Sequence, residues 1–347
     1  MLPDKQGISI SKSYPKTGYV NEYKKGDVLL SNIRPYFKKI YLAKNDGGCS
    51  ADVLVISPQK GTNNKFLYYL LSQDAFFSYV MSGAKGCKMP RGDKKHILEW
   101  NIPLIDIRIQ KEIAGILSSL DAKIETNNKL NEKLEEMAQA IFKSWFVDFE
   151  PFKDQPFHET EIGLIPEGWE VGNILDIAEL FDSQRKPLSS MERENMKGKY
   201  PYYGATSIMD YIDKYIFDGT YVLMGEDGSV VKKNGTPYLQ YVWGKFWPNN
   251  HAHVMQGKNG FSTEMLYCLL SISDISSIVT GAVQMKISQR SMSRLLTVVP
   301  SHSICLEFNK LIKPLFKIIK RNNEENDRLA SLRDTLLPRL MSGEIKI

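Results

Sequence analysis

Few side chains in this sequence have the types and spacing that a catalytic or metal site requires. His251 and His253 stand close together, but no third residue with metal-ligand spacing lies near them. The loop 225–228 combines glycine with two carboxylates, a composition that fits an ordinary turn. Neither glycine-rich phosphate-binding motif occurs, and no Ser/His/Asp order can be assigned. We therefore expect no catalytic residue and no metal ligand, and interpret the chain as a binding protein.

Clusters of cationic side chains offer a different chemistry, which is contact with nucleic acid. Segment 34–39 interleaves cations with aromatic residues, and segment 85–95 is a basic loop that we expect to precede a strand. Segment 284–294 concentrates hydrogen-bond donors at the corresponding place in the second half of the chain. Arg, Lys, Asn and Gln read base edges through paired hydrogen bonds. Each segment is either a DNA contact or a solvated loop, and its recurrence in both halves favours the first interpretation.

The candidate DNA contacts have cationic, amide or aromatic side chains in or near these segments. They are Arg34, Lys38, Lys39, Lys85, Lys88, Arg91, Tyr202, Tyr203, Asn249, Asn250, His251, Lys286, Gln289 and Arg290. The tyrosines fit a core position as well as a contact, because aromatic residues at strand ends often pack inward. Lys88, Arg91, Lys286 and Arg290 are the preferred contacts, with Lys88 matched to Lys286. The sequence does not separate base readers from phosphate contacts.

Composition describes a folded chain with a basic first part. Hydrophobic residues make up 42% of the sequence, and the net charge is +5. Residues 1–107 have 16 basic and 9 acidic side chains, whereas residues 151–301 have 14 basic and 17 acidic ones. The 4 cysteines are far apart, and neither a long apolar run nor a signal peptide is present. We expect a reduced, cytoplasmic protein whose first part favours a polyanionic partner.

An internal repeat with an offset of about 195 residues organises the chain. Residues 112–145 and 307–340 share their apolar positions and an Asn-Asn pair. The fold class expected is α+β, with two globular mixed domains that are each followed by a long helix. The boundaries predicted are a first domain at 1–107, a helical spacer at 108–150, a second domain at 151–301 and a second spacer at 302–347.

The two long helices have the apolar spacing of a coiled coil. Steps of three and four residues predict that they pack against each other as an antiparallel pair. Asn127 and Asn322 interrupt the apolar stripe, and they either fix the helix register or solvate a bend. Pro314 is expected to kink or shorten the second helix. About 35 helical residues make a rod of roughly 50 Å, which would hold the two domains at a set distance.

The globular parts are predicted to contain short strands and helices. Glycine-bounded β-rich runs at 27–31, 51–56, 221–224 and 238–243 predict strands, and helices are expected at about 64–81 and 262–277. The two repeats differ at their starts. Gly219 follows Leu164 by 55 residues, whereas only 25 residues precede the equivalent Gly26. The first domain therefore lacks about 30 residues relative to the second, including a counterpart of the block LIPEGWE.

Several sequence blocks are similar to those of a known family. They are LIPEGWE at 164–170, YPYYGAT at 200–206, GTYVLMGEDG at 219–228, KFWPNNHAHV at 245–254 and the helical block at 130–151. With them, the chain resembles the specificity (S) subunit of a type I restriction-modification system. The family usually opens with a full first domain, whereas this sequence starts inside one.

That resemblance implies a function in host defence and DNA methylation. Two target-recognition domains would each read half of a bipartite DNA site, and the helices would bind two methyltransferase (M) subunits. S-adenosylmethionine would lie on the M subunits, while ATP and Mg would act on restriction (R) subunits, so that this non-catalytic chain binds no cofactor directly. The alternative is a coiled-coil scaffold that binds proteins and has no DNA specificity of its own. A self-contained methylase or nuclease is disfavoured because its motifs are missing.

Overall fold

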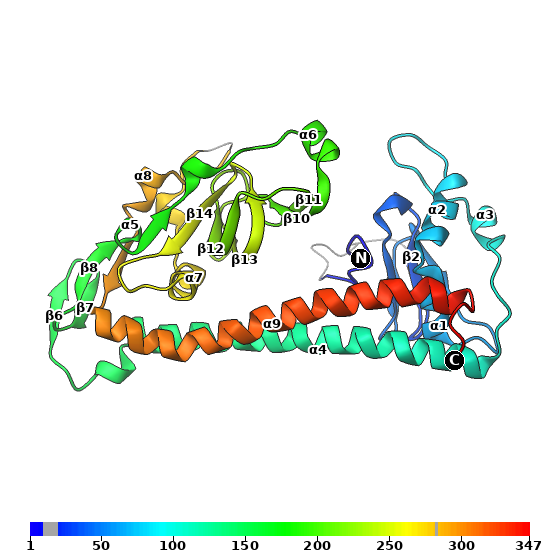
Figure 1. Ribbon diagram of the computed structural model, residues 1–347, viewed down its shortest axis with the longest axis horizontal. Helices are drawn as coiled ribbons and strands as arrows, with labels where there is room; N and C mark the ends of the chain where they lie inside the picture. The colour runs from blue at the N-terminus through cyan, green and yellow to red at the C-terminus, as the bar shows by residue number, and fades with distance from the viewer. Residues whose placement is uncertain (10–19, 282–283) are drawn as a thin grey trace. The chain divides into compact units, whose positions relative to one another are not determined.

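The computed structural model describes residues 1–9, 20–281 and 284–347, and it divides into two compact units (Figure 1). The first unit contains Met1–Asn127 and Glu324–Ile347, and the second contains Asn128–Asn323. Each unit therefore combines one globular domain of strands and short helices with one half of each long helix. The predicted α+β class, with a long helix after each mixed domain, is confirmed.

The two long helices are α4 (Ile107–Phe146) and α9 (His302–Met341), and both contain 40 residues. Their first and last residues differ by the same 195 positions, as the repeat predicted. The expectation that Pro314 shortens the second helix is wrong, because α9 continues through it. Proline removes one backbone hydrogen bond from a helix interior. Buried apolar residues on both sides of Pro314, among them Ile312 and Phe316, stabilise the helix against that loss.

The globular domain of the first unit is built on a three-stranded sheet. Strand β2 (Val28–Ser31) lies at its centre and pairs antiparallel with β3 (Ile40–Leu42) and β5 (Val53–Ile56). A second small sheet pairs β1 (Asn21–Tyr23) with β4 (Gly47–Cys49). The helix predicted at 64–81 is divided in two, and the helical elements are η1 (Pro35–Phe37), α1 (Asn64–Leu71), α2 (Asp74–Ser82) and α3 (Lys94–Leu98).

The globular domain of the second unit has a larger sheet of six strands in the order β11-β10-β13-β12-β14-β9. These strands are β9 (Ala178–Leu180), β10 (Lys197–Tyr203), β11 (Ile208–Ile212), β12 (Phe217–Gly225), β13 (Leu239–Pro248) and β14 (Ala252–Gly257). Two further pairs join β6 (Phe157–Thr160) to β7 (Gly163–Pro166) and β8 (Glu170–Asn173) to β15 (Leu296–Val299). Short helical elements are η2 (Glu150–Phe152), α5 (Ile174–Ile177), η3 (Asp182–Gln184), α6 (Ser190–Asn195), α7 (Thr263–Ile272), η4 (Ser276–Ile278) and α8 (Gln289–Met292).

Within each unit, the halves of α4 and α9 pack side by side in opposite directions. In the first unit, the early residue Leu117 of α4 shares a buried cluster with the late residue Leu340 of α9. In the second unit, the late residue Phe142 of α4 contacts the early residue Phe308 of α9, with ring centroids 5.7 Å apart. Removing a buried aromatic ring of this kind costs about 3–5 kcal/mol. The predicted antiparallel pairing is therefore present in both units.

Buried asparagines lie in the apolar seam of each helix pair. In the first unit, Asn127 Nδ2 donates to Asn326 Oδ1 at 2.9 Å. In the second unit, Asn322 Nδ2 donates to Asn131 Oδ1 at 2.8 Å. Asn127 and Asn322 are 1% and 3% exposed, so the interpretation that they solvate a bend is wrong. Their effect on helix register stays a prediction.

The helices have no membrane-spanning character. Among the residues that the structure describes, no helix is long and apolar enough to cross a bilayer.

Candidate nucleic-acid interface

Each unit contains a loop that is closed by a reciprocal pair of backbone hydrogen bonds. In the first unit, Lys85 and Arg91 exchange N–H···O bonds of 2.9 Å in both directions. In the second unit, Thr280 and Lys286 exchange bonds of 2.8 and 2.7 Å. We call 85–91 the first loop and 280–286 the second loop, of which residues 282 and 283 lie outside the described residues. The spacing of six residues is the same in both.

The backbone around these loops aligns Arg91 with Lys286. Arg34 N donates to Pro90 O in the first unit, and Gly228 N donates to Met285 O in the second. The following residues bind the sheet in the same way, since Gly92 N donates to Asn32 O and Ile287 N donates to Glu226 O. Because Pro90 and Met285 precede the two cations directly, the sequence-based match of Lys88 with Lys286 is wrong by three residues.

A glycine at the same place in each loop explains this register. Gly86 and Gly281 have φ of +101° and +89°, in the left-handed region that favours glycine. A Cβ at Gly281 would lie 2.2 Å from Gln284 O, so a larger residue would open the loop. The expected strand after the first loop is also wrong, because residues 101–104 are not a strand and the loop leads into α3. Asp93 caps that helix, as Ser288 caps α8 in the second unit.

Cations of the first loop differ in how they are held. Lys85 Nζ lies 2.7 Å from Asp93 Oδ2, and with backbone N–H groups it holds the pKa of the Asp93 carboxyl at about 2. Arg91 Nη2 lies 3.1 Å from Asp52 Oδ1. Lys88 is exposed, and no ion pair to it is present among the described residues. Arg91 is therefore pre-oriented by a carboxylate, whereas Lys88 is free to move.

The second loop repeats this arrangement. Lys286 Nζ lies 3.4 Å from Glu226 Oε1, and its side chain is 52% exposed. Gln289 Nε2 donates to Asp182 Oδ2 at 2.7 Å. Arg290 is exposed and has no ion pair in the described part of the chain. Lys286 is thus held by a carboxylate, as Arg91 is, while Arg290 corresponds in freedom to Lys88.

The cluster at 34–39 lies beside the first loop. Arg34 and Lys38 both have φ of 49° and flank the turn η1. Lys38 Nζ lies 3.0 Å from Asp74 Oδ1, and Lys39 Nζ lies 5.4 Å from the centre of the Phe37 ring. Arg34 and Lys39 line a cavity of about 420 Å³ together with Met89 of the first loop. The structure therefore brings Arg34 and Lys39 to the first loop, while Lys38 is paired elsewhere.

Two candidates of the second unit are buried, so the expectation that they contact DNA directly is corrected. Tyr202 is 1% exposed and its hydroxyl accepts a hydrogen bond from Leu188 N. Asn249 is 4% exposed, and its Oδ1 accepts from His251 N at 2.8 Å. Both side chains face inward because their own polar atoms are needed to close turns.

Their neighbours remain available as candidates. Tyr203 is half-buried, whereas Asn250 and His251 are exposed on the turn that Asn249 shapes. His251 Nδ1 contacts Asp227 Oδ1, next to the second loop. Asn249 therefore positions this turn, and Asn250 and His251 present their side chains from it.

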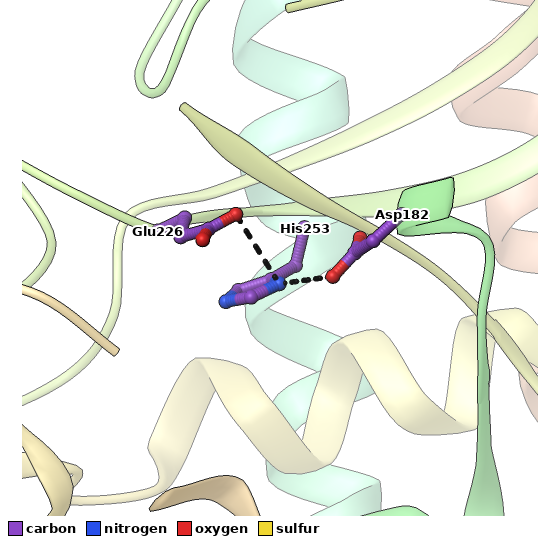
Figure 2. A group of neighbouring side chains, drawn as sticks. All are labelled: Asp182, Glu226 and His253. Atoms are coloured by element: carbon purple, nitrogen blue, oxygen red, sulfur yellow. Dashed lines mark hydrogen bonds and ion pairs between the residues drawn. The ribbon is translucent and has the colours of Figure 1, made fainter. Parts of the chain in front are cut away.

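A charged network beneath the second loop was not predicted from the sequence. We call Asp182, Arg185, Glu226 and His253 the Asp182 network. His253 Nδ1 lies 2.6 Å from Asp182 Oδ2 and 3.7 Å from Glu226 Oε2, and Figure 2 shows the ring between the two carboxylates. Arg185 Nη1 donates to Glu226 Oε2 at 2.7 Å and to Ala252 O at 2.6 Å. Two carboxylates and two cationic groups thus meet in a nearly water-free site.

Hydrogen bonding fixes the chemical state of this network. His253 Nε2 faces Ile287 O at 2.8 Å, so both ring nitrogens face acceptors and both must donate. Burial alone would raise the pKa of Asp182, but hydrogen bonds from His253, Gln289 and Val254 N lower it below its usual range. The network therefore contains a charged Asp182 and attaches the second loop to β14 through Ile287.

The same residues are close enough for a metal ion, but their donor atoms are already used. Ligand atoms of Asp182, Glu226 and His253 lie within 4.8 Å of one another. The Arg185 guanidinium supplies the positive charge at Glu226, and His253 donates to Asp182. We therefore describe an ion-pair network. Sequence reasoning noted the acidic loop at 225–228 but had no signal for Asp182 or Arg185.

Comparison with known proteins gives the same family twice along the chain. The family model described as the type I restriction modification DNA specificity domain matches residues 3–136 and 166–329. The specificity subunit of the type I restriction enzyme MjaIX from Methanocaldococcus jannaschii is 29% identical over 343 residues, covering 94% of this chain and 79% of that relative. The HindI specificity subunit from Haemophilus influenzae is 25% identical over 407 residues, covering 93% and 87%.

A solved structure agrees in fold. The S subunit of a type I restriction-modification system from M. genitalium matches with a TM-score of 0.51 at 19% identity, covering 98% of this chain and 90% of that one. Because the family model accounts for most of the sequence, this chain belongs to the specificity-subunit family of type I restriction-modification systems.

Proposed function

We propose that this chain recognises DNA for a type I restriction-modification complex, with each globular domain contacting one half of a bipartite site. The observation that supports this most is the equivalence of Arg91 and Lys286. Both follow a loop of the same length, both leave the sheet through the same backbone bonds, and both are held by a carboxylate. A matched cation on two different domains fits two readings of the same polyanion.

The preferred cations have separate roles in this proposal. Arg91 and Lys286 read bases, because base readout needs a side chain with a defined direction, which Asp52 and Glu226 provide. Lys88 and Arg290 contact phosphates, since a phosphate tolerates a mobile cation. Arg34, Lys39, Asn250 and His251 extend the two surfaces.

The chain itself performs no reaction in this proposal. Methyltransferase subunits dock on the paired helices and hold S-adenosylmethionine, and restriction subunits supply the ATP-dependent activity. The chain therefore acts in DNA methylation and host defence by positioning other subunits. Its own residues bind, orient and select DNA.

Genome-wide mapping of N6-methyladenine tests the proposal directly. The chain is expressed with its cognate methyltransferase subunits in a host that lacks the modification. We expect methylation at one bipartite sequence, and none when either component is expressed alone. Methylation without sequence preference, or duplex binding whose affinity does not fall with salt, would support a protein scaffold instead.

A further inference from the structure

The central sheets of the two units correspond strand for strand. In the first unit, β2 pairs with β5 so that Val28 lies opposite Ile56. In the second unit, β12 pairs with β14 so that Val222 lies opposite Met255. Since β2 and β12 lead into the equivalent loop contacts, β5 and β14 occupy the same place in their sheets.

The outer edge of this strand is covered in the second unit and open in the first. Strand β9 pairs antiparallel with β14, placing Leu180 opposite Met255. Residues 252–255 of β14 are all buried, at 0 or 1% exposure. Within the described residues, no strand pairs with the outer edge of β5, and all four residues of Val53–Ile56 are half-buried.

A groove lies along this open edge. It has a volume of about 540 Å³ and is lined mainly by apolar side chains, including Leu54, Phe76, Ile97, Trp100 and Ile102. Near it, Leu98 is 85% exposed, Ile102 is 50% exposed and Leu104 is fully exposed. Large apolar side chains clustered in this way on a surface mark a binding site for another apolar group.

The second unit shows what such a groove contains when it is filled. Residues 296–299, which correspond to 101–104, form β15 and pair with β8. The segment 164–181 supplies β8, α5 and β9, and it buries Trp169, Ile174, Ile177 and Ala178. One segment thus adds a strand to both equivalents of the open edges in the first unit. The sequence has no counterpart of this segment before Gly26.

We propose that the groove of the first unit binds a segment of another polypeptide with the pattern of residues 164–181. The bound segment adds one strand to β5, as β9 does to β14, and a second strand to residues 101–104. Its tryptophan and aliphatic side chains fill the groove between them. Backbone hydrogen bonds provide the affinity of such strand addition, and the apolar pockets provide the selectivity. This inference is independent of DNA recognition.

A peptide of residues 164–181, LIPEGWEVGNILDIAELF, is the probe for this site. Added to the full chain, the labelled peptide is expected to bind saturably at one site. Binding should slow amide hydrogen exchange at residues 53–57 and 101–104. The control peptide has Trp169→Ser, Ile177→Asp and Leu180→Asp, and it should bind at least tenfold more weakly.

Variants of the full chain separate the groove from unspecific binding. Ile102→Glu changes an exposed side chain, so the fold should persist while peptide affinity falls tenfold or more. Leu104→Glu is a second variant at a fully exposed position, with the same expected result. Met191→Glu alters an exposed apolar side chain of the second unit and should leave binding unchanged.

Three results would overturn the proposal. The first is equal binding of the two peptides or equal binding to the Ile102→Glu variant. The second is a concentration-dependent dimer that the peptide does not displace but Ile102→Glu abolishes, since the occupant is then a second copy. The third is peptide binding that requires deletion of residues 1–20, which would identify the chain's own N-terminal residues as the occupant.

Discussion

His253 Nδ1 lies 2.6 Å from Asp182 Oδ2, although the two residues are 71 positions apart in the sequence. The contact joins η3 to β14, and the other ring nitrogen joins β14 to the end of the second loop at Ile287. Asp182 also accepts from Gln289 Nε2 at 2.7 Å. One carboxylate therefore determines how the proposed DNA-contacting loop of the second unit is held.

Replacing this carboxylate should damage one half-site only. Asp182→Ala leaves His253 and Arg185 without a buried partner, and such a loss costs about 3–5 kcal/mol. We expect a lower free energy of unfolding and loss of base preference at one half-site, with the other half-site still recognised. Urea unfolding and methylation mapping measure the two effects. Glu161→Ala, which removes an exposed carboxylate, is the matched control; equal effects of both variants would contradict the role assigned to Asp182.

Stability should depend on pH through the same residue. The folded-state pKa of Asp182 is below its usual range because hydrogen bonds outweigh burial. Its contribution is therefore complete above the unfolded pKa of about 3.9 and is lost as pH falls through the folded pKa. Urea unfolding between pH 5 and 3 should show a steeper loss of stability for the native chain than for Asp182→Asn. Parallel slopes would show that other carboxylates dominate acid unfolding.

The asparagine pair of the first unit should behave as a coupled unit. Asn127→Leu leaves Asn326 Oδ1 without its donor and should cost about 1–3 kcal/mol. Adding Asn326→Leu should recover part of that loss, because both partners are then apolar. A double-mutant cycle by urea unfolding measures the coupling, with Asn322→Leu and Asn131→Leu as the matched cycle in the second unit. Strictly additive costs would rule out coupling through this hydrogen bond.

The proposed base readers should act on different half-sites. Arg91→Ala should relax base preference in one half-site, and Lys286→Ala should relax it in the other, each costing about 1–3 kcal/mol of discrimination. Binding to a library of duplexes with the M subunits present measures this. If both variants relax the same half-site, the assignment of one domain to each half is wrong.

The proposed phosphate contacts should weaken binding without changing sequence preference. Lys88→Ala and Arg290→Ala should each lower affinity on all duplexes and reduce the slope of log affinity against log salt by about 1. Lys233→Ala, at an exposed lysine of the second unit, serves as the comparison. An unchanged salt slope would remove the two cations from the interface.

Helix length should control the distance between half-sites if the paired helices set it. Inserting four residues into both α4 and α9 lengthens each by about 6 Å. That length corresponds to roughly two base pairs at about 3.4 Å each. Methylation mapping should then report a longer spacer between unchanged half-sites; altered bases with the original spacer would contradict this role.

The sequence by itself determined the repeat, the two long helices and their antiparallel seam. Apolar residues at steps of three and four are a local pattern, and the same pattern recurs 195 residues later, so α4 and α9 could be predicted from spacing alone. The buried position of Asn127 and Asn322 also follows from that stripe. The shortened start of the first domain was visible as a difference in length between the repeats.

Only the tertiary structure decided the register of the loops and the contents of the site. Arg91 and Lys286 become equivalent through backbone bonds to the sheet, which similarity of residue types does not report. Tyr202 and Asn249 are buried because strand pairing directs them inward. Asp182 meets His253 only after β9 pairs with β14, and β5 lacks such a partner among the described residues. These relationships depend on contacts between residues far apart in the chain, whereas periodicity records only the near neighbours of each residue.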